Sequence, residues 1–313
     1  FLIFSIRVSG QADLSSPYSR FGLGDINSGS PSTILKGMGG ISNAISDKSL
    51  LNPNNPASYA NLDSLSFVFD AGFYIKTANY STNGLSEKGS NASFDYASVG
   101  MSATKWWKLG IGIMPYSNRE YNVITKHNDL GSYNVSFQGE GGINKFFLAN
   151  GFKITKDLSI GITASYLFGT LIDNTSIYYP DSVYYLNGKR SIDMRVSDFK
   201  FDYGILYRLP IPSYNITIGF TYSQEANLKS KRNLFIRNMF NGYENLTESP
   251  IDTLKYIENE KVDLTIPHGF GAGITIDRGR GWLIGADFNW TGWKGFEMNG
   301  VNDSIQNSWN VAV

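Results

Sequence analysis

Few side chains in this sequence have the types and spacing that catalysis or metal binding requires. The chain contains no Cys, which excludes a thiolate nucleophile, thiolate metal sites and disulfides. Its two His residues, His127 and His268, leave little material for a metal site. The sequence contains no G-x-S-x-G motif that could form a hydrolase triad with either His, and no G-x-x-x-x-G-K-S/T phosphate loop. We therefore expect that the protein is not an enzyme and has neither a cofactor nor a metal site.

An acid-rich stretch offers a different chemistry. Carboxylates at this density could bind Ca²⁺ or a partner protein, but a solvated loop is the simpler interpretation. The residues are Glu244, Glu248, Asp252, Glu258 and Glu260, in a polar region that we expect to be the longest loop, residues 231–260.

Apolar and small residues near the N-terminus form a candidate binding region. Residues 13–62 are rich in Gly, Ser, Pro and Asn, and such a segment makes neither a helix interior nor a central strand. We interpret it as a compact irregular element with a β-barrel around it. Its apolar residues could line a ligand pocket or could pack the element's own small core. The candidate residues for ligand binding or for the plug itself are Phe21, Leu23, Met38, Asn55, Pro56 and Ala57.

A second candidate region lies in the stretch 106–123. Gly110 and Gly112 alternate there with apolar residues, and Pro115 follows. Because proline cannot donate a hydrogen bond to a β-ladder, Pro115 must lie at a bulge or at a missing hydrogen bond of a closed barrel. We expect Gly110, Gly112 and Pro115 either to open a lateral exit or to form a bulge near the rim.

The elements that must position these residues are β-strands. From residue 65 on, apolar and polar residues alternate with a period of two, as in Phe67, Phe69, Ala71, Phe73 and Ile75. No apolar run reaches the length of a transmembrane helix after the N-terminus. An aromatic content of 14% and a charged content of 17% fit a membrane β-barrel, but also a large soluble β-sandwich or solenoid.

Two patterns favour the membrane barrel. Aromatic residues end many apolar rows, such as Tyr214 with Tyr222 and Trp282 with Trp290, as expected at the two interfaces of a bilayer. Short connections alternate with longer ones near 79–92, 124–132, 179–191 and 231–260, which is typical of outer-membrane barrels. We expect an all-β fold, an antiparallel transmembrane β-barrel with about ten strands. The last strand is incomplete, so we expect a chain truncated at its C-terminus; closure at ten strands is the alternative.

The charge balance and the N-terminal residues complete the expected organisation of the chain. The 27 basic and 27 acidic residues cancel, so nothing indicates a nucleic-acid partner. The first residues, Phe1-Leu2-Ile3-Phe4 and the small residues after them, look like the end of a secretory signal peptide. We therefore divide the chain into a signal-peptide remnant (1–10), an N-terminal plug (11–62) and an incomplete transmembrane β-barrel (63–313).

The Asn55-Pro56-Ala57 tripeptide, which follows Gly39-Gly40 and precedes the first expected strand, resembles the plug of the FadL-type outer-membrane transporters of hydrophobic compounds. Ile266-Pro267 before a Gly-rich strand, and the strand that ends in Trp290-Thr291-Gly292-Trp293, are similar to further motifs of that family. The resemblance spans nearly the whole chain. The segment 15–22 is not part of the motif associated with characterised fatty-acid transporters.

This resemblance implies a 14-stranded barrel, of which about four strands lie outside the chain. It also implies a ligand that enters from outside, binds near the plug and leaves sideways at the kinked third strand. We therefore expect a channel in the outer membrane of a Gram-negative bacterium for passive uptake of small hydrophobic molecules such as long-chain fatty acids. The expected partners are these molecules and outer-membrane lipid. The alternative is a barrel that does not transport but docks a partner protein in a secretion or surface-assembly system.

Overall fold

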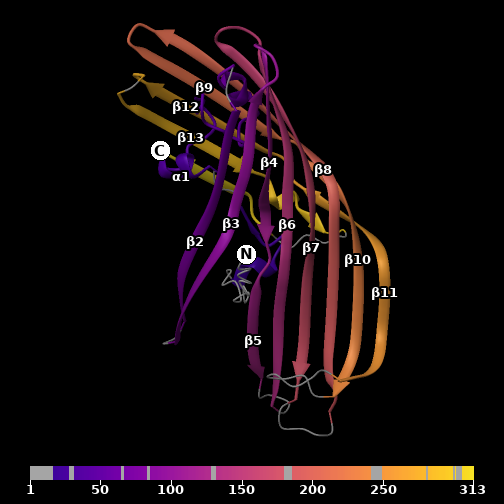
Figure 1. Cartoon of the computed structure of the whole chain (residues 1–313). Helices are drawn as coiled ribbons and strands as arrows, with labels where there is room; N and C mark the ends of the chain where they lie inside the picture. The colour runs from indigo at the N-terminus through magenta and orange to yellow at the C-terminus, as the bar shows by residue number, and fades with distance from the viewer. Residues whose placement is uncertain are drawn as a thin grey trace, which may run out of the picture.

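The fold is an antiparallel β-sheet that curves around an irregular N-terminal segment (Figure 1). The computed structural model describes residues 17–27, 32–64, 67–82, 85–127, 132–179, 185–240, 249–279, 281–298, 300 and 305–313. The expected signal-peptide remnant, residues 1–10, lies outside the described residues. Within these ranges, no helix is both long and apolar enough to cross a membrane.

The sheet has 15 strands, and its main path runs β15-β13-β12-β9-β8-β7-β6-β4-β3-β2. Off this path, β1 pairs with β4, β5 with β6, β10 with β8 and β11, and β14 with β11. The strands are β1 Asp25–Ile26, β2 Phe67–Thr82, β3 Leu85–Ser102, β4 Trp107–Asn118, β5 Tyr121–His127, β6 Tyr133–Lys153, β7 Leu158–Tyr178, β8 Asn187–Ile211, β9 Tyr214–Ser223, β10 Ala226–Phe240, β11 Ser249–Ile266, β12 Gly269–Asp277, β13 Leu283–Thr291, β14 Glu297–Met298 and β15 Ser308–Ala312.

The strands expected from the sequence are all present, but several are interrupted. Residues 214–240 are divided into β9 and β10 at Gln224, and residues 249–277 are divided into β11 and β12 at Pro267. A proline cannot donate to the ladder, which accounts for the second interruption. The stretch 106–123 is also divided, into β4 and β5, and this interruption lies at Arg119.

Two expected loops are wrong. Residues 79–82 and 85–92 belong to the hairpin of β2 and β3, and most of 231–260 belongs to β10 and β11. Asp252, Glu258 and Glu260 therefore lie on a strand, where Glu260 pairs with Arg232, rather than in a solvated loop. Polar residues on both faces hid these strands, because alternation weakens where a strand is wet on both sides.

The wall has an apolar outer face, as the alternation predicts. Phe67, Phe69, Phe73 and Ile75 of β2 are exposed. On β8, exposed residues alternate with buried ones that face the plug. The exposed residues of β8 are Phe199, Phe201, Tyr203, Ile205 and Tyr207.

The plug segment, here the described residues 17–27 and 32–64, has little regular structure. It contains η1 Pro17–Arg20, α1 Thr33–Gly37 and η2 Pro56–Asn61; η3 Trp293–Gly295 lies between β13 and β14. The Asn55 side chain caps η2 by accepting a hydrogen bond from the Ala57 N–H at 3.0 Å, with Pro56 at the first helical position. These residues are buried.

The plug segment touches the wall where the strands carry glycine. A Cβ added at Gly161 would lie 2.3 Å from the carbonyl carbon of Pro56, and one at Gly151 would lie 2.4 Å from the Ala60 nitrogen. Backbone atoms cannot rotate away, so only glycine permits this approach. We call these inward-facing residues the glycine belt: Gly100, Gly110, Gly151, Gly161, Gly204, Gly219, Gly273 and Gly285.

Register aligns this belt across neighbouring strands. Gly161 of β7 lies opposite both Gly151 of β6 and Gly204 of β8, and Gly219 of β9 lies opposite Gly273 of β12. The belt therefore forms a shallow track in the wall that receives residues 43–44 and 55–60 of the plug segment.

We predict that Gly161→Ala loosens the plug. The added methyl overlaps the Pro56 backbone, and overpacking of this kind lowers the free energy of unfolding by about 1–3 kcal/mol. Thermal unfolding, together with limited proteolysis of the plug segment, measures the effect. Gly188→Ala on β8 is the matched control, because no atom lies within 4 Å of its added Cβ. Equal melting temperatures and equal protease resistance of the two variants would contradict the role of the belt.

Candidate functional site

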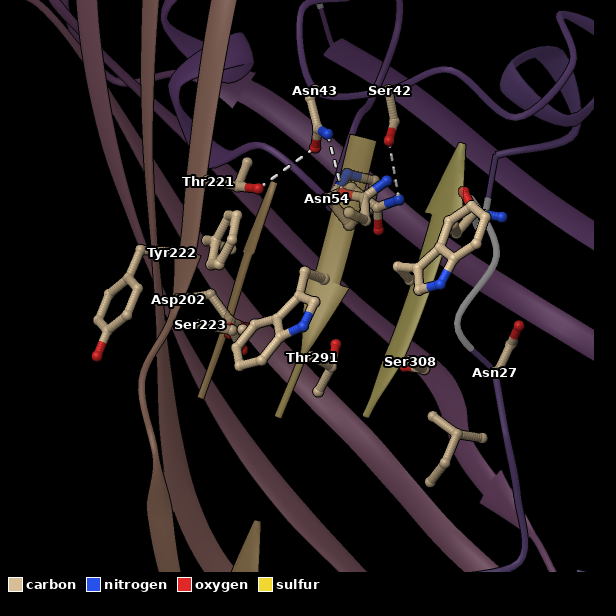
Figure 2. A pocket seen from close by; sticks show the side chains of 18 of the residues that line it. Asn27, Ser42, Asn43, Asn54, Asp202, Thr221, Tyr222, Ser223, Thr291 and Ser308 are labelled. Carbon is tan, nitrogen blue, oxygen red and sulfur yellow. Dashed lines mark hydrogen bonds between the residues drawn. The ribbon is translucent and has the colours of Figure 1, made fainter. Parts of the chain in front are cut away.

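A cavity of about 920 Å³ lies between the plug segment and strands β9, β12, β13 and β15 (Figure 2). We call it the chamber. Its lining mixes polar side chains, among them Asn43, Asn54 and Thr221, with aromatic ones such as Phe270, Trp290 and Trp309. A mixed lining of this kind suits a solute that has both a polar and an apolar part.

The floor of the chamber is fixed by Asp287 of β13. One of its oxygens, Oδ2, accepts hydrogen bonds from the backbone N–H groups of Ser42 at 2.5 Å and Asn43 at 2.7 Å. The Asn43 side chain donates to Asn289 Oδ1 at 2.9 Å and accepts from the Thr221 hydroxyl at 3.3 Å (Figure 2). A buried carboxylate thus holds the plug backbone, while one amide side chain bridges two strands.

The Asn55-Pro56-Ala57 tripeptide connects this floor to the rest of the wall. Asn55 donates from Nδ2 to the carbonyl of Asn43 at 2.6 Å, and its Oδ1 lies where a Cβ of Gly204 would be. Tyr59, at the end of the same turn, is fully buried beneath Gly110, and burial raises the pKa of its phenol. The tripeptide therefore acts as a structural joint of the plug.

The remaining plug candidates are not brought together. Leu23 is buried in a cluster with Phe296, Met38 packs against a different cluster that contains Leu35, and Phe21 is exposed beneath the Arg20 guanidinium. None of the three is among the described residues that line the chamber. Their role in ligand binding stays a prediction.

A charged cluster on the inner wall borders the chamber. Asp202 of β8 accepts from Lys200 Nζ at 2.5 Å, and Lys145 Nζ of β6 lies 3.4 Å from its other oxygen. Ser223 donates to the same carboxylate at 2.7 Å. Two cations thus share one carboxylate. The alternation places Lys200 and Asp202 on the inner face, but only the fold brings Lys145, sequence-distant from both, to them.

The ladder between β3 and β4 ends at the second candidate region. Its last pair is Ala97 with Ile113. In the described residues, the part of β3 that precedes Ala97 pairs only with β2, and β5 pairs only with β6, so β3 and β5 do not pair with each other. The register of β4 with β6 shifts between Pro115 and Ser117, which is the bulge that proline predicts. We call this interruption between β3 and β4–β5 the lateral slot.

The glycines beside the slot have packing roles. A Cβ at Gly110 would overlap the Tyr59 ring, and one at Gly112 would overlap the Phe147 ring and the Ala97 carbonyl. Gly110 and Gly112 therefore lie on the inner face just before the slot, and Pro115 lies at its edge. Their part in a lateral exit stays a prediction.

The slot is occupied by the plug segment. Strand β1 pairs with β4 there, with Asp25 opposite Asn118 and Ile26 opposite Ser117, so it takes the edge that β3 leaves. Gly24 adopts a φ of 93°, and a Cβ at this position would lie 2.3 Å from the Asn118 carbonyl oxygen.

A buried arginine at the interruption between β4 and β5 holds the arm that carries β1, residues 19–26, in place. The Arg119 guanidinium donates to the Gly22 carbonyl and, at 2.5 Å, to Asp173 of β7, which also accepts from the Tyr121 hydroxyl at 2.6 Å. The Ser19 hydroxyl donates to the Glu120 carbonyl at 3.0 Å. Sequence reasoning missed Arg119, and the interruption of its strand by a charged residue was the available signal.

The comparisons with known proteins agree with this architecture. No curated protein matches the sequence of this chain. A family model with the description BamG matches residues 1–313. A solved structure of a Pseudomonas aeruginosa FadL homologue matches with a TM-score of 0.55 at 12% identity, over 92% of this chain and 76% of that chain.

A second solved structure, the CymD monoaromatic hydrocarbon channel, matches with a TM-score of 0.51 at 13% identity, over 94% of this chain and 76% of that chain. At these identities the likeness establishes the fold alone. The chain has the fold of FadL-type outer-membrane transporters, which confirms the resemblance found in the plug and in the Trp-rich strand.

We predict that Asp287→Ala frees the floor of the chamber. The substitution leaves two plug N–H groups without their charged acceptor, at a cost of about 2–4 kcal/mol in local stability. Hydrogen exchange of peptides that cover residues 42–45 should accelerate. Asp277→Ala is the control, because that carboxylate accepts from Asn215 and from its own turn at Gly279, away from the plug. Unchanged exchange in the Asp287 variant would show that the plug is held by packing alone.

Proposed function

The chain belongs to the BamG family, and we propose that it acts as a channel for passive uptake of small hydrophobic molecules, such as long-chain fatty acids, across the outer membrane of a Gram-negative bacterium. A FadL homologue and a monoaromatic hydrocarbon channel share its fold, which supports this class of solute. The observation that carries the proposal is the lateral slot between β3 and β4. A solute that leaves through a break in the wall passes directly into lipid and never crosses the polar turns.

In this mechanism β1 is the gate of the slot. It is held by a short ladder to β4 and by the Arg119 contacts with Gly22 and Asp173. Each hydrogen bond contributes about 1 kcal/mol net and the burial of Leu23 about 1.5–3 kcal/mol, so detaching this arm costs several kcal/mol and leaves the barrel wall intact. Pro115 lies beyond the last β3–β4 pair and has no N–H with which to extend that ladder, whereas Gly110 and Gly112 still pair with Gly100 and Ser98 of β3.

The chamber would receive the polar end of an amphipathic solute. Lys145 and Lys200 share the single carboxylate of Asp202, so this cluster carries an excess positive charge that a solute carboxylate would balance. The hydroxyl of Ser165, which lines the same chamber, is buried without a hydrogen-bond partner. These groups favour a fatty acid over a hydrocarbon without a polar group.

A second candidate function is the docking of a partner protein. The outer half of the β10–β11 hairpin exposes large apolar side chains, and an exposed apolar patch far from the lipid-facing band is typical of a protein interface. We infer from the family description, BamG, that the partner belongs to a Bam complex. The residues are Phe240, Ile251, Leu254 and Tyr256.

We predict that locking β1 onto β4 stops uptake. Because the chain contains no Cys, Ile26→Cys with Ser117→Cys introduces a single disulfide between directly paired residues. In liposomes that contain the purified protein, uptake of a fluorescent fatty acid should fall to background after oxidation and return after reduction. The control pair, Ile216→Cys with Ile276→Cys, links β9 to β12 on the outer face and should leave uptake unchanged. Transport that persists through the oxidised β1 lock would exclude this exit.

We also predict that the protein retains fatty acid when it is purified in mild detergent. Mass spectrometry of the extracted lipids should find fatty acid in wild type, and less of it after Lys145→Gln with Lys200→Gln, since the solute loses its counter-charge. Lys105→Gln with Lys156→Gln, at exposed turns, is the matched control. An absence of bound lipid together with a stoichiometric protein partner would favour the docking function instead.

A further inference from the structure

Three basic residues lie in one row across the outer wall. Lys231 of β10 is paired directly with Arg195 of β8 on one side and with Lys261 of β11 on the other, and the three strands run side by side (Figure 1). Directly paired residues in an antiparallel sheet lie about 4.5–5.5 Å apart between Cα atoms. Like charges in this arrangement destabilise the sheet, so the row calls for a compensating anion.

The row faces away from the plug. Arg195 lies between Met194 and Val196, which are buried in the inner apolar cluster, and Lys261 precedes Val262, which is also buried. Arg195, Lys231 and Lys261 are themselves exposed. Their three side chains therefore point outward together, on the face that also carries the apolar band.

In the described part of the chain, no carboxylate forms an ion pair with the row. Asp193 and Asp263 each stand two residues away along a strand, and Asp263 is paired with a further cation, Lys229. At the neighbouring positions, Arg232 pairs with Glu260. None of the ion pairs found among the described residues includes a cation of the row.

The height of the row places it beside lipid head groups. The outward band of β8 runs from Phe199 to Tyr207, about 26 Å along the strand and roughly 20 Å across the bilayer at the usual tilt of outer-membrane barrels. Arg195 lies four residues beyond Phe199, which is about 13 Å along the strand and roughly 10 Å above the apolar band. The polar head-group region of a bilayer occupies this level.

We propose that Arg195, Lys231 and Lys261 form a binding site for the phosphate groups of a phosphorylated lipid in the outer leaflet. The inference rests on the outer-membrane placement proposed above, but not on transport. Guanidinium and ammonium groups bind phosphate through charge-assisted hydrogen bonds, and a phosphate is the anion that the membrane itself supplies at this height. An acidic protein fits less well, because the row borders the lipid-facing band of β8 rather than the tips of the outer loops.

The test measures lipid-dependent stability of the full chain in nanodiscs. Phosphatidylcholine nanodiscs are compared with nanodiscs that also contain bisphosphorylated lipid A, and the melting temperature and the lipid A retained are recorded. Wild type should melt several degrees higher with lipid A. In Arg195→Gln with Lys231→Gln and Lys261→Gln, this gain should disappear and retention should fall about ten-fold or more. Lys105→Gln with Lys156→Gln and Arg278→Gln, at exposed positions of the short turns, should behave like wild type.

A second variant separates the site from a folding defect. Lys231→Glu places a carboxylate between Arg195 and Lys261, so it should match or exceed wild-type stability in phosphatidylcholine and lose the gain from lipid A. Equal lipid A retention in wild type and both variants would overturn the proposal. Equal protection by inorganic phosphate alone, or by lipid A whose phosphates have been removed, would also overturn it, because the ligand would then be a free anion or an acyl chain. Failure of the transport tests leaves these outcomes unaffected.

Discussion

The close approach of the plug backbone to the strand glycines is the constraint on which the rest of the structure depends. Gly151, Gly161 and Gly204 form a track on adjacent strands, and residues 55–60 of the plug lie in it with no space for a side chain. This contact fixes the depth and orientation of the plug. Asp287 and Asn43 are then within hydrogen-bond distance, so the buried carboxylate finds its backbone donors.

With its centre fixed, the plug segment reaches both sides of the lateral slot. On the β3 side, Lys36 of α1 pairs with Asp95, and the Tyr96 hydroxyl accepts from the Thr33 N–H at 3.0 Å. On the β4 side, β1 adds a short ladder and Arg119 binds the Gly22 carbonyl. The polar contacts of both attachments are few, and on the β4 side Leu23 also packs against Phe296. They can yield one at a time while the glycine track keeps the rest of the plug in place.

The inner and outer faces of the wall carry different side chains, and the outer face also changes along the strands, from the apolar band to the part beyond it. Inside, Lys145, Lys200 and Asp202 border the chamber, whereas outside, β8 carries an exposed apolar band. Beyond that band the strands continue far past the length that a membrane requires, because β8 alone has 25 residues. The row of cations on β8, β10 and β11 is exposed just beyond the band, and the extra length continues past that row.

The sequence by itself determined the all-β class, the positions of many strands, the outward apolar face of residues 67–75 and the irregular character of the N-terminal segment, because alternation and proline placement are local properties. It also located the bulge at Pro115. Only the tertiary structure decided which glycines face the plug, that Leu23 and Met38 belong to separate clusters, and that β1 lies in the slot. Those facts depend on register between strands and on contacts between residues far apart in the chain. A one-residue slip would turn each side chain to the other face, and no local pattern specifies such pairings.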